Sequence, residues 1–361
     1  AAPTVAPTEK PTTAPTATAM PADMNMGMAD PFRVSIAQNF LDSAGFHGIA
    51  ETLSDTQKID PTYYGTVTRV TKVLSQTTWP TELNDQAQEF IGSLNAFATA
   101  LANDDTKAAV ETSDTVHDAQ HELSHAIDAW MTTNSMKMGG ADPFNVSVAQ
   151  YFLDSAGFHG MAEVLSDTQK IDPTYYGTVT RVTKVLSQTT WPTELNDQAQ
   201  AFIGSLNAFS TALANDDTKA AIETSDTVHD AQHELSHAID AWIATKPTMS
   251  KEADPFNISV AQYFLDSAGF HGMAEVLSDT QKIDPTYYGT VTRVAKVLKQ
   301  TTWPAELNDQ AQAFIKSLDD FATALSNDDV AKSVEVSDVV HDAQHELSHA
   351  IDAWSGSAHA H

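Results

Sequence analysis

The chain consists of one unit that occurs three times with a constant step of 112 residues. Each unit opens with Ala-Asp-Pro-Phe and closes with Ala-Ile-Asp-Ala-Trp, so that residue 30 recurs at positions 142 and 254. A unit of roughly 100 residues is long enough to bury a core of its own. We therefore expect three domains at residues 30–132, 142–244 and 254–355, followed by a short tail at 356–361.

Four helical patterns fill each unit. In the first unit they begin at Asp30, Asp60, Pro80 and Asp105, and the first of them extends to about Leu53. Aspartate followed by proline is typical of a helix start, because the carboxylate caps the helix and proline is tolerated in the first turn. The third pattern shows the alternating steps of four and three that mark a bundle core, at Leu83, Ala87, Phe90, Leu94, Phe97 and Leu101. The sequence thus predicts an all-α protein of three tandem up-down-up-down four-helix bundles, which implies multivalency or a linear array.

Composition excludes several classes of function. The chain has 48 acidic and 19 basic residues and a formal charge of −29, which disfavours nucleic acid and anionic lipid and favours cations. No cysteine is present, so thiolate zinc sites, Fe–S clusters and Cys-attached haem are excluded. No stretch is long and apolar enough for a membrane span. Residues 1–29, rich in Pro, Thr, Ala and Met, are typical of an extended tether, and we expect an extracytoplasmic protein, secreted or tethered to the cell surface.

The histidines recur with the unit. Apart from His359 and His361, every histidine occupies one of four repeated positions, and three of these form H-x-x-x-H-x-x-x-H on the predicted last helix of the unit. That spacing lines imidazoles along one helical stripe, about one turn apart and beside the core stripe. Carboxylates at both ends of the stripe could orient the imidazoles as second-shell partners. These ladder positions are His117, His121, His125, His229, His233, His237, His341, His345 and His349, and the flanking carboxylates are Asp114, Asp128, Asp226, Asp240, Asp338 and Asp352.

The first predicted helix contributes side chains that should face the histidines of the last helix. His47 and Glu51 are spaced i and i+4 and continue the apolar line of Phe40 and Ala44. In an up-down bundle the first and last helices are antiparallel neighbours, so His47 and Glu51 should meet His117 or His121, with His125 deeper. The equivalent pairs are His159 with Glu163 and His271 with Glu275.

Two glycines bracket His47 in the predicted first helix. Glycine inside a helix costs about 1 kcal/mol against alanine. A close neighbour at Gly45 and Gly48, either a packed helix or a flat ligand such as a porphyrin, is therefore expected as compensation.

His121-Glu122-Leu123-Ser124-His125 also satisfies H-E-x-x-H, the pattern of zinc peptidases. The pattern is short, it arises by chance in histidine-rich helices, and the predicted fold offers no strand-built substrate cleft. We therefore do not expect an enzyme.

Imidazole with carboxylate suits zinc, copper, nickel or iron. Methionines in the tether and in the joint between the first two units favour copper, because thioether ligands favour Cu(I). The sequence predicts a multivalent transition-metal-binding protein, with Cu or Zn favoured, for sequestration or delivery. Two alternatives stay open: a haem b or redox-metal carrier with bis-histidine ligation between the first and last helices, and a structural repeat or filament-forming homo-oligomer with pH- or metal-responsive histidines.

Overall fold

The computed structural model describes residues 29–134, 141–246 and 252–358. This part of the chain is entirely α-helical, which confirms the predicted class. The predicted tether, except for its last residue, lies outside the described residues, as do most of the two joints between units and the last three residues of the tail.

Each unit contributes five helices to the described part of the chain. In the first unit these are α1 (Pro31–Ser43), α2 (Phe46–Thr56), α3 (Thr62–Gln76), α4 (Thr81–Ala102) and α5 (Thr106–Thr133). The second unit has α6 (Pro143–Ser155), α7 (Phe158–Thr168), α8 (Pro173–Gln188), α9 (Thr193–Ala214) and α10 (Thr218–Ile243). The third has α11 (Pro255–Ser267), α12 (Phe270–Thr280), α13 (Pro285–Gln300), α14 (Ala305–Ser326) and α15 (Val330–Ala358).

The predicted helix starts agree with the structure, but the predicted first helix is in fact two helices. Asp30 accepts a hydrogen bond from the backbone N–H of Phe32, as a helix N-cap does. The helix then stops at Ser43, and Gly45 adopts a left-handed conformation with φ of +71° before α2 begins. Glycine suits this position because other residues reach that conformation only at a steric cost. A bundle of helices is therefore present in each unit, whereas the simple up-down-up-down order is not confirmed.

All five helices contribute to the core of the first unit, and α1 supplies Val34, Ala37 and Leu41. The most extensive contact joins α4 to α5. Helix α2 packs against α5, and α3 packs against α4. The predicted core positions of α4 are buried, with Phe90, Leu94 and Phe97 fully inaccessible to solvent. On α5 the buried side chains are Val116, Leu123 and Ile127 among others. His117, His121 and His125 lie beside this buried stripe, at the flank of the core, as predicted.

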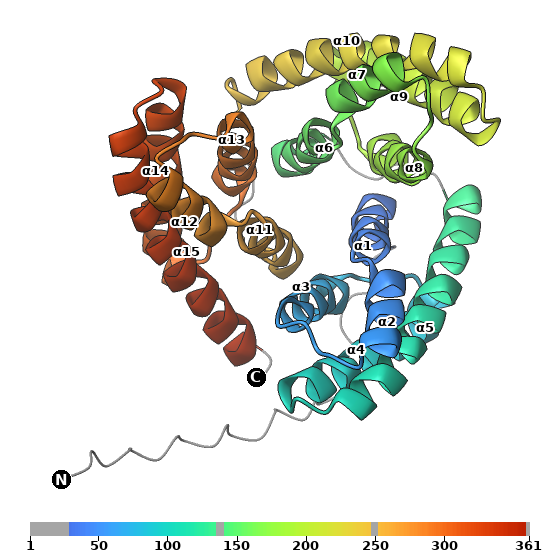
Figure 1. Cartoon of the computed structure of the whole chain (residues 1–361), viewed down its shortest axis with the longest axis vertical. Coiled ribbons are helices and arrows are strands. Elements are labelled where there is room, and N and C mark those ends of the chain that lie inside the picture. The colour runs from blue at the N-terminus through green and yellow to red at the C-terminus, as the bar shows by residue number, and fades with distance from the viewer. Residues whose placement is uncertain (1–28, 135–140, 247–251, 359–361) are drawn as a thin grey trace.

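The remaining helix of each unit joins the units together. Helix α1 packs on α8 of the second unit, α6 on α13 of the third, and α11 on α3 of the first. Figure 1 shows α1, α6 and α11 meeting in the middle of the molecule, with the long helices α5, α10 and α15 on the outside. The three units thus close into a ring with pseudo-threefold symmetry rather than extending as a linear array.

A separate apolar cluster fills the middle of the ring, and we call it the central core. It contains buried phenylalanine, valine and isoleucine side chains from all three units: Phe32, Ile36, Phe40, Val73, Phe144, Val148, Phe152, Val185, Phe256, Val260, Phe264 and Val297. At about 25 cal/mol per Å² of apolar surface, a cluster of this size is a major source of stability for the ring. Because all three units contribute to this one buried cluster, we expect the stability of each unit to depend on the other two.

Ion pairs repeat at the three interfaces between units. Lys184 of α8 pairs with Asp128 of α5 at 2.6 Å, Lys296 pairs with Asp240 at 2.6 Å, and Lys72 pairs with Asp352. Partly exposed pairs of this kind contribute little stability but fix register. In the described part of the chain, no helix combines the length and apolar character that crossing a membrane requires.

Candidate functional site

Three imidazoles meet at the same place in every unit, and we call them the histidine trio. In the first unit they are His47, in the first turn of α2, and His117 and His121, one turn apart on α5. Nδ1 of His47 lies 3.0 Å from Nε2 of His117, and Nε2 of His121 lies 3.1 Å from that same atom. The equivalent distances are 3.1 and 3.0 Å in the other two units, for His159, His229 and His233 and for His271, His341 and His345.

The break at Gly45 positions this trio. Because α2 starts again after the break, His47 lies on a helix that packs against α5 rather than on α1, which turns toward the central core. The expected contact between His47 and His117 is therefore present, although the helix that provides it differs from the one predicted. The expectation of a packed helix close to the glycines is wrong: a methyl group added at Gly45 or at Gly48 would meet no described protein atom within 4 Å.

Nε2 of His117 is the shared atom of the trio. If both neighbours donate N–H groups to this atom, it must be unprotonated, and the proton of His117 then lies on Nδ1. Nδ1 lies 3.3 Å from a carboxylate oxygen of Asp118. A carboxylate on the far nitrogen is the arrangement that commonly orients a metal-binding histidine. In the other units the corresponding distances are longer, 3.7 Å to Asp230 and 3.8 Å to Asp342.

The trio is accessible from solvent. The side chain of His117 is 25% exposed, and His47 and His121 are more exposed than that. Solutes can therefore reach the three nitrogens without any rearrangement of the core, which a site for an exchangeable ion requires.

Two of the predicted ligand positions lie apart from the trio. The ring of His125 is stacked 6.3 Å from the ring of His121 and is exposed rather than deeper in the bundle. Glu51 and Asp114 are exposed, and neither forms a hydrogen bond or an ion pair with a histidine anywhere in the described residues. His237, His349, Glu163, Glu275, Asp226 and Asp338 occupy the equivalent positions.

The predicted carboxylates at the far end of the ladder serve the interface between units. Asp128 accepts a hydrogen bond from the side-chain amide of Gln38 at 2.7 Å and pairs with Lys184 of the next unit. Asp240 and Asp352 repeat this arrangement with Gln150 and Gln262. These contacts replace the expected orientation of imidazoles. The sequence around Asp128 does not reveal this ion pair, because the lysine that pairs with Asp128 belongs to another unit.

A polar cavity lies beside the trio, between the first and second units. It has a volume of about 280 Å³, and its lining includes His121, His125, Asp42, Arg181 and Lys184. Burial raises the pKa of the Asp42 carboxyl, while hydrogen bonding to Ser124 and the charge of Lys184 oppose the shift. Asp42 and Asp118 are not among the predicted site residues, because Asp118 fits a solvated charge beyond the histidine stripe and Asp42 lies on a different helix.

The described residues hold no group of three or more His, Cys, Asp or Glu side chains that is already spaced to hold a metal ion. The nitrogens of the trio instead lie at hydrogen-bond distance, 3.0 to 3.1 Å apart. Two nitrogens bound to one tetrahedral zinc are about 3.3–3.4 Å apart, given Zn–N bonds of about 2.0–2.1 Å. The rings would therefore have to move apart and turn before three lone pairs could face one ion.

Comparison with protein-family models, with curated proteins and with solved structures finds no match for this chain.

Proposed function

We propose that this protein binds transition-metal ions at three equivalent sites, one in each unit, with the histidine trio as the protein ligands. The observation that carries the proposal is the convergence of Nδ1 of His47 and Nε2 of His121 on Nε2 of His117, repeated in all three units. Three imidazole nitrogens from two helices are a common donor set for zinc and copper, and they leave a position open for a further ligand.

Proton chemistry supports the same proposal. If the two outer imidazoles donate N–H groups to the central nitrogen in the absence of metal, binding would move these protons to the other nitrogen of each ring and turn three lone pairs toward the ion. Asp118 can hold the central ring in the required tautomer. The formal charge of −29 attracts cations to the surface that carries the sites.

The ligand set favours zinc or copper over calcium or magnesium, because imidazole is a poor ligand for hard cations. We propose that the three sites serve sequestration or delivery of the metal in an extracytoplasmic setting. Three solvent-accessible sites on one stable ring suit a carrier, since each ion can enter and leave independently.

The competing functions have less support. Haem ligation by His47 and His117 requires a flat macrocycle and its iron between the two rings, whereas their nitrogens are in direct contact at 3.0 Å. A zinc peptidase requires His121 and His125 to share the ion, whereas His121 turns its Nε2 toward His117. A purely structural role for the ring accounts for the central core but does not account for three converging imidazoles.

The test replaces the α2 histidine in all three units, His47→Ala with His159→Ala and His271→Ala, in the full chain. Zinc and copper(II) affinities are measured by calorimetry with competing chelators. We expect a loss of more than about 100-fold, because removing even an outer-shell partner of a metal site costs about 10–100-fold. The circular dichroism spectrum verifies that the variant folds.

A matched control replaces the histidines outside the trio, His125→Ala with His237→Ala and His349→Ala. These rings are equally accessible, so the control should retain affinity within about threefold. Equal losses in both variants would overturn the trio as the ligand set. A second control, Glu122→Gln with its two equivalents, should leave metal binding unchanged; an accompanying loss of a measurable peptidase activity would replace the carrier proposal with an enzyme.

A further inference from the structure

One position in the central region breaks the threefold repeat. Residue 39 is asparagine, whereas the equivalent residues of the second and third units are Tyr151 and Tyr263. All three lie on the helices that meet in the middle of the ring, next to a phenylalanine of the central core. The three interfaces between units therefore differ here, as they also do at Arg33, which pairs with Asp254 of the third unit and is replaced by asparagine in the other two units.

At two interfaces the tyrosine lies on a phenylalanine of the next unit. Tyr151 stacks on Phe264 and Tyr263 stacks on Phe40, both with ring centroids 3.9 Å apart and interplanar angles of 26° and 27°. Ser267 and Arg293 lie near the Tyr151 hydroxyl and influence its pKa, and Ser43 and Arg69 have the same relation to Tyr263. Each tyrosine ring thus occupies a slot formed by a phenylalanine, a serine and an arginine.

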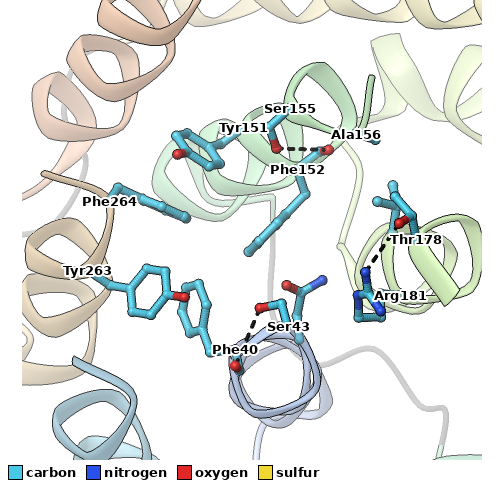
Figure 2. Close-up of a pocket in the computed structure, with 12 residues that line it drawn as sticks. Phe40, Ser43, Tyr151, Phe152, Ser155, Ala156, Thr178, Arg181, Tyr263 and Phe264 are labelled. Carbon is cyan, nitrogen blue, oxygen red and sulfur yellow. Dashed lines mark hydrogen bonds between the residues drawn. The ribbon is translucent and has the colours of Figure 1, made fainter. Parts of the chain in front are cut away.

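At the third interface the slot is present and its tyrosine is absent. By the threefold repeat, a tyrosine at residue 39 would stack on Phe152. Phe152 is 7% exposed, whereas Phe40 and Phe264, on which tyrosines do stack, are 1% exposed. A cavity of about 240 Å³ lies there, and its lining includes Asn39, Phe152, Ser155 and Arg181. Figure 2 shows Phe152 pointing into this cavity, with Arg181 and Thr178 on one side and the Tyr263–Phe40 pair on the other.

We propose that this cavity binds a free single-ring phenol, one molecule per chain. The ligand takes the place that the tyrosine side chains occupy at the other two interfaces. Its ring stacks on Phe152, and its hydroxyl group donates a hydrogen bond to Oγ of Ser155. The volume is slightly below the 300 Å³ or so at which pockets for drug-sized ligands begin, which suits a single ring rather than a fused system.

The polar groups of the slot match a hydroxyl group. Oγ of Ser155 donates a hydrogen bond to the backbone carbonyl oxygen of Phe152 at 3.3 Å, so the lone pairs of Oγ can still accept one. At the two interfaces that contain a tyrosine, Ser43 and Ser267 donate the equivalent hydrogen bonds to the carbonyl oxygens of Phe40 and Phe264. Arg181 is held in place by a hydrogen bond from Nη2 to the hydroxyl of Thr178 at 3.2 Å. Its guanidinium lies on the oxygen side of the slot and favours a phenol over a neutral alkylbenzene.

The experiment titrates 4-methylphenol, which reproduces the tyrosine side chain, into the metal-free full-length protein and follows binding by calorimetry. We expect one site per chain. We also expect 4-methylphenol to bind about fivefold more tightly than toluene, because about fivefold is the gain in affinity that one neutral hydrogen bond provides. Metal-free protein separates this result from the histidine sites, because the slot contains no member of the trio.

Two variants give opposite expectations for the number of sites. Asn39→Tyr should fill the slot, abolish saturable binding and raise the melting temperature. Tyr151→Asn should open the same slot at the next interface, so that two molecules of 4-methylphenol bind per chain. Binding to Asn39→Tyr within about threefold of the original affinity, or toluene binding as tightly as 4-methylphenol, would overturn the proposal; so would the absence of saturable binding to the unmodified chain.

Discussion

Replacing Phe264 with alanine tests whether the three units form one cooperative structure. Phe264 is 1% exposed, its ring centroid lies 5.7 Å from those of both Phe40 and Phe152, and Tyr151 stacks on its face. It therefore contacts all three units at once. Truncation of a buried phenylalanine to alanine costs about 3–5 kcal/mol.

The expected fall in melting temperature depends on how much of the chain unfolds together. The entropy of unfolding is about 2.1 cal/mol/K per residue, so a loss of 3–5 kcal/mol lowers the melting temperature by about 4–7 °C if the roughly 320 described residues unfold as one. If the third unit unfolds alone, with about 105 residues, the same loss lowers its own transition by about 14–23 °C and leaves the other two unchanged.

Differential scanning calorimetry of the metal-free protein distinguishes these outcomes. We predict one transition that moves by about 4–7 °C as a whole. The control Tyr64→Ala removes an aromatic ring that is 48% exposed, and it should change the melting temperature by less than about 1 °C. A separate low-temperature transition in Phe264→Ala, with the remainder unmoved, would refute the coupling of the units through the central core.

Three further predictions concern the glycines, the tyrosine at the interface and the metal. Gly45→Ala should destabilise the first unit by about 1–2 kcal/mol, because the φ of Gly45 is +71°. Gly48→Ala should stabilise it by about 1 kcal/mol, because Gly48 lies in a helix with open space around it. Equal effects of the two substitutions in denaturant unfolding would contradict the helix break. Burial raises the pKa of Tyr151 to about 12, so the stability it contributes is complete below its ordinary value near pH 10 and is lost as the pH rises through 12. Melting temperatures of Tyr151→Phe should therefore fall less than those of the unmodified chain between pH 10 and 12, and parallel curves would exclude this assignment. Metal affinity should fall on acidification, because imidazoles must be neutral to bind, and undiminished affinity in acid would identify carboxylates as the ligands.

The sequence was sufficient for the parts of the fold that depend on local pattern. Aspartate before proline marked the helix starts, and the steps of four and three marked the buried face of α4. The break at Gly45 was missed because the apolar line of Phe40 and Ala44 continues across it toward His47. A single glycine within a continuing pattern is compatible with both a helix and a break, and only the packing of α1 against another unit favours the break.

Closure of the ring depends on contacts between units, which a periodic pattern does not reveal. Helix α1 is apolar on two faces: Leu41 belongs to the core of its own unit and Phe40 to the central core. A helix that is apolar on more than one side indicates burial on more than one side, and this was the available signal. The contact of His47 with His117 followed from the bundle, whereas the true partner of Asp128 did not, because Lys184 is supplied by the neighbouring unit.

Metal stoichiometry is the most direct test of the central claim. Native mass spectrometry of the full chain, loaded with zinc or copper(II) and freed of excess metal, counts the ions that each molecule retains. Three converging histidine trios predict three ions per chain, and none in the variant that lacks His47, His159 and His271. A chain that retains a single ion, or a triple variant that still retains three, would contradict the account.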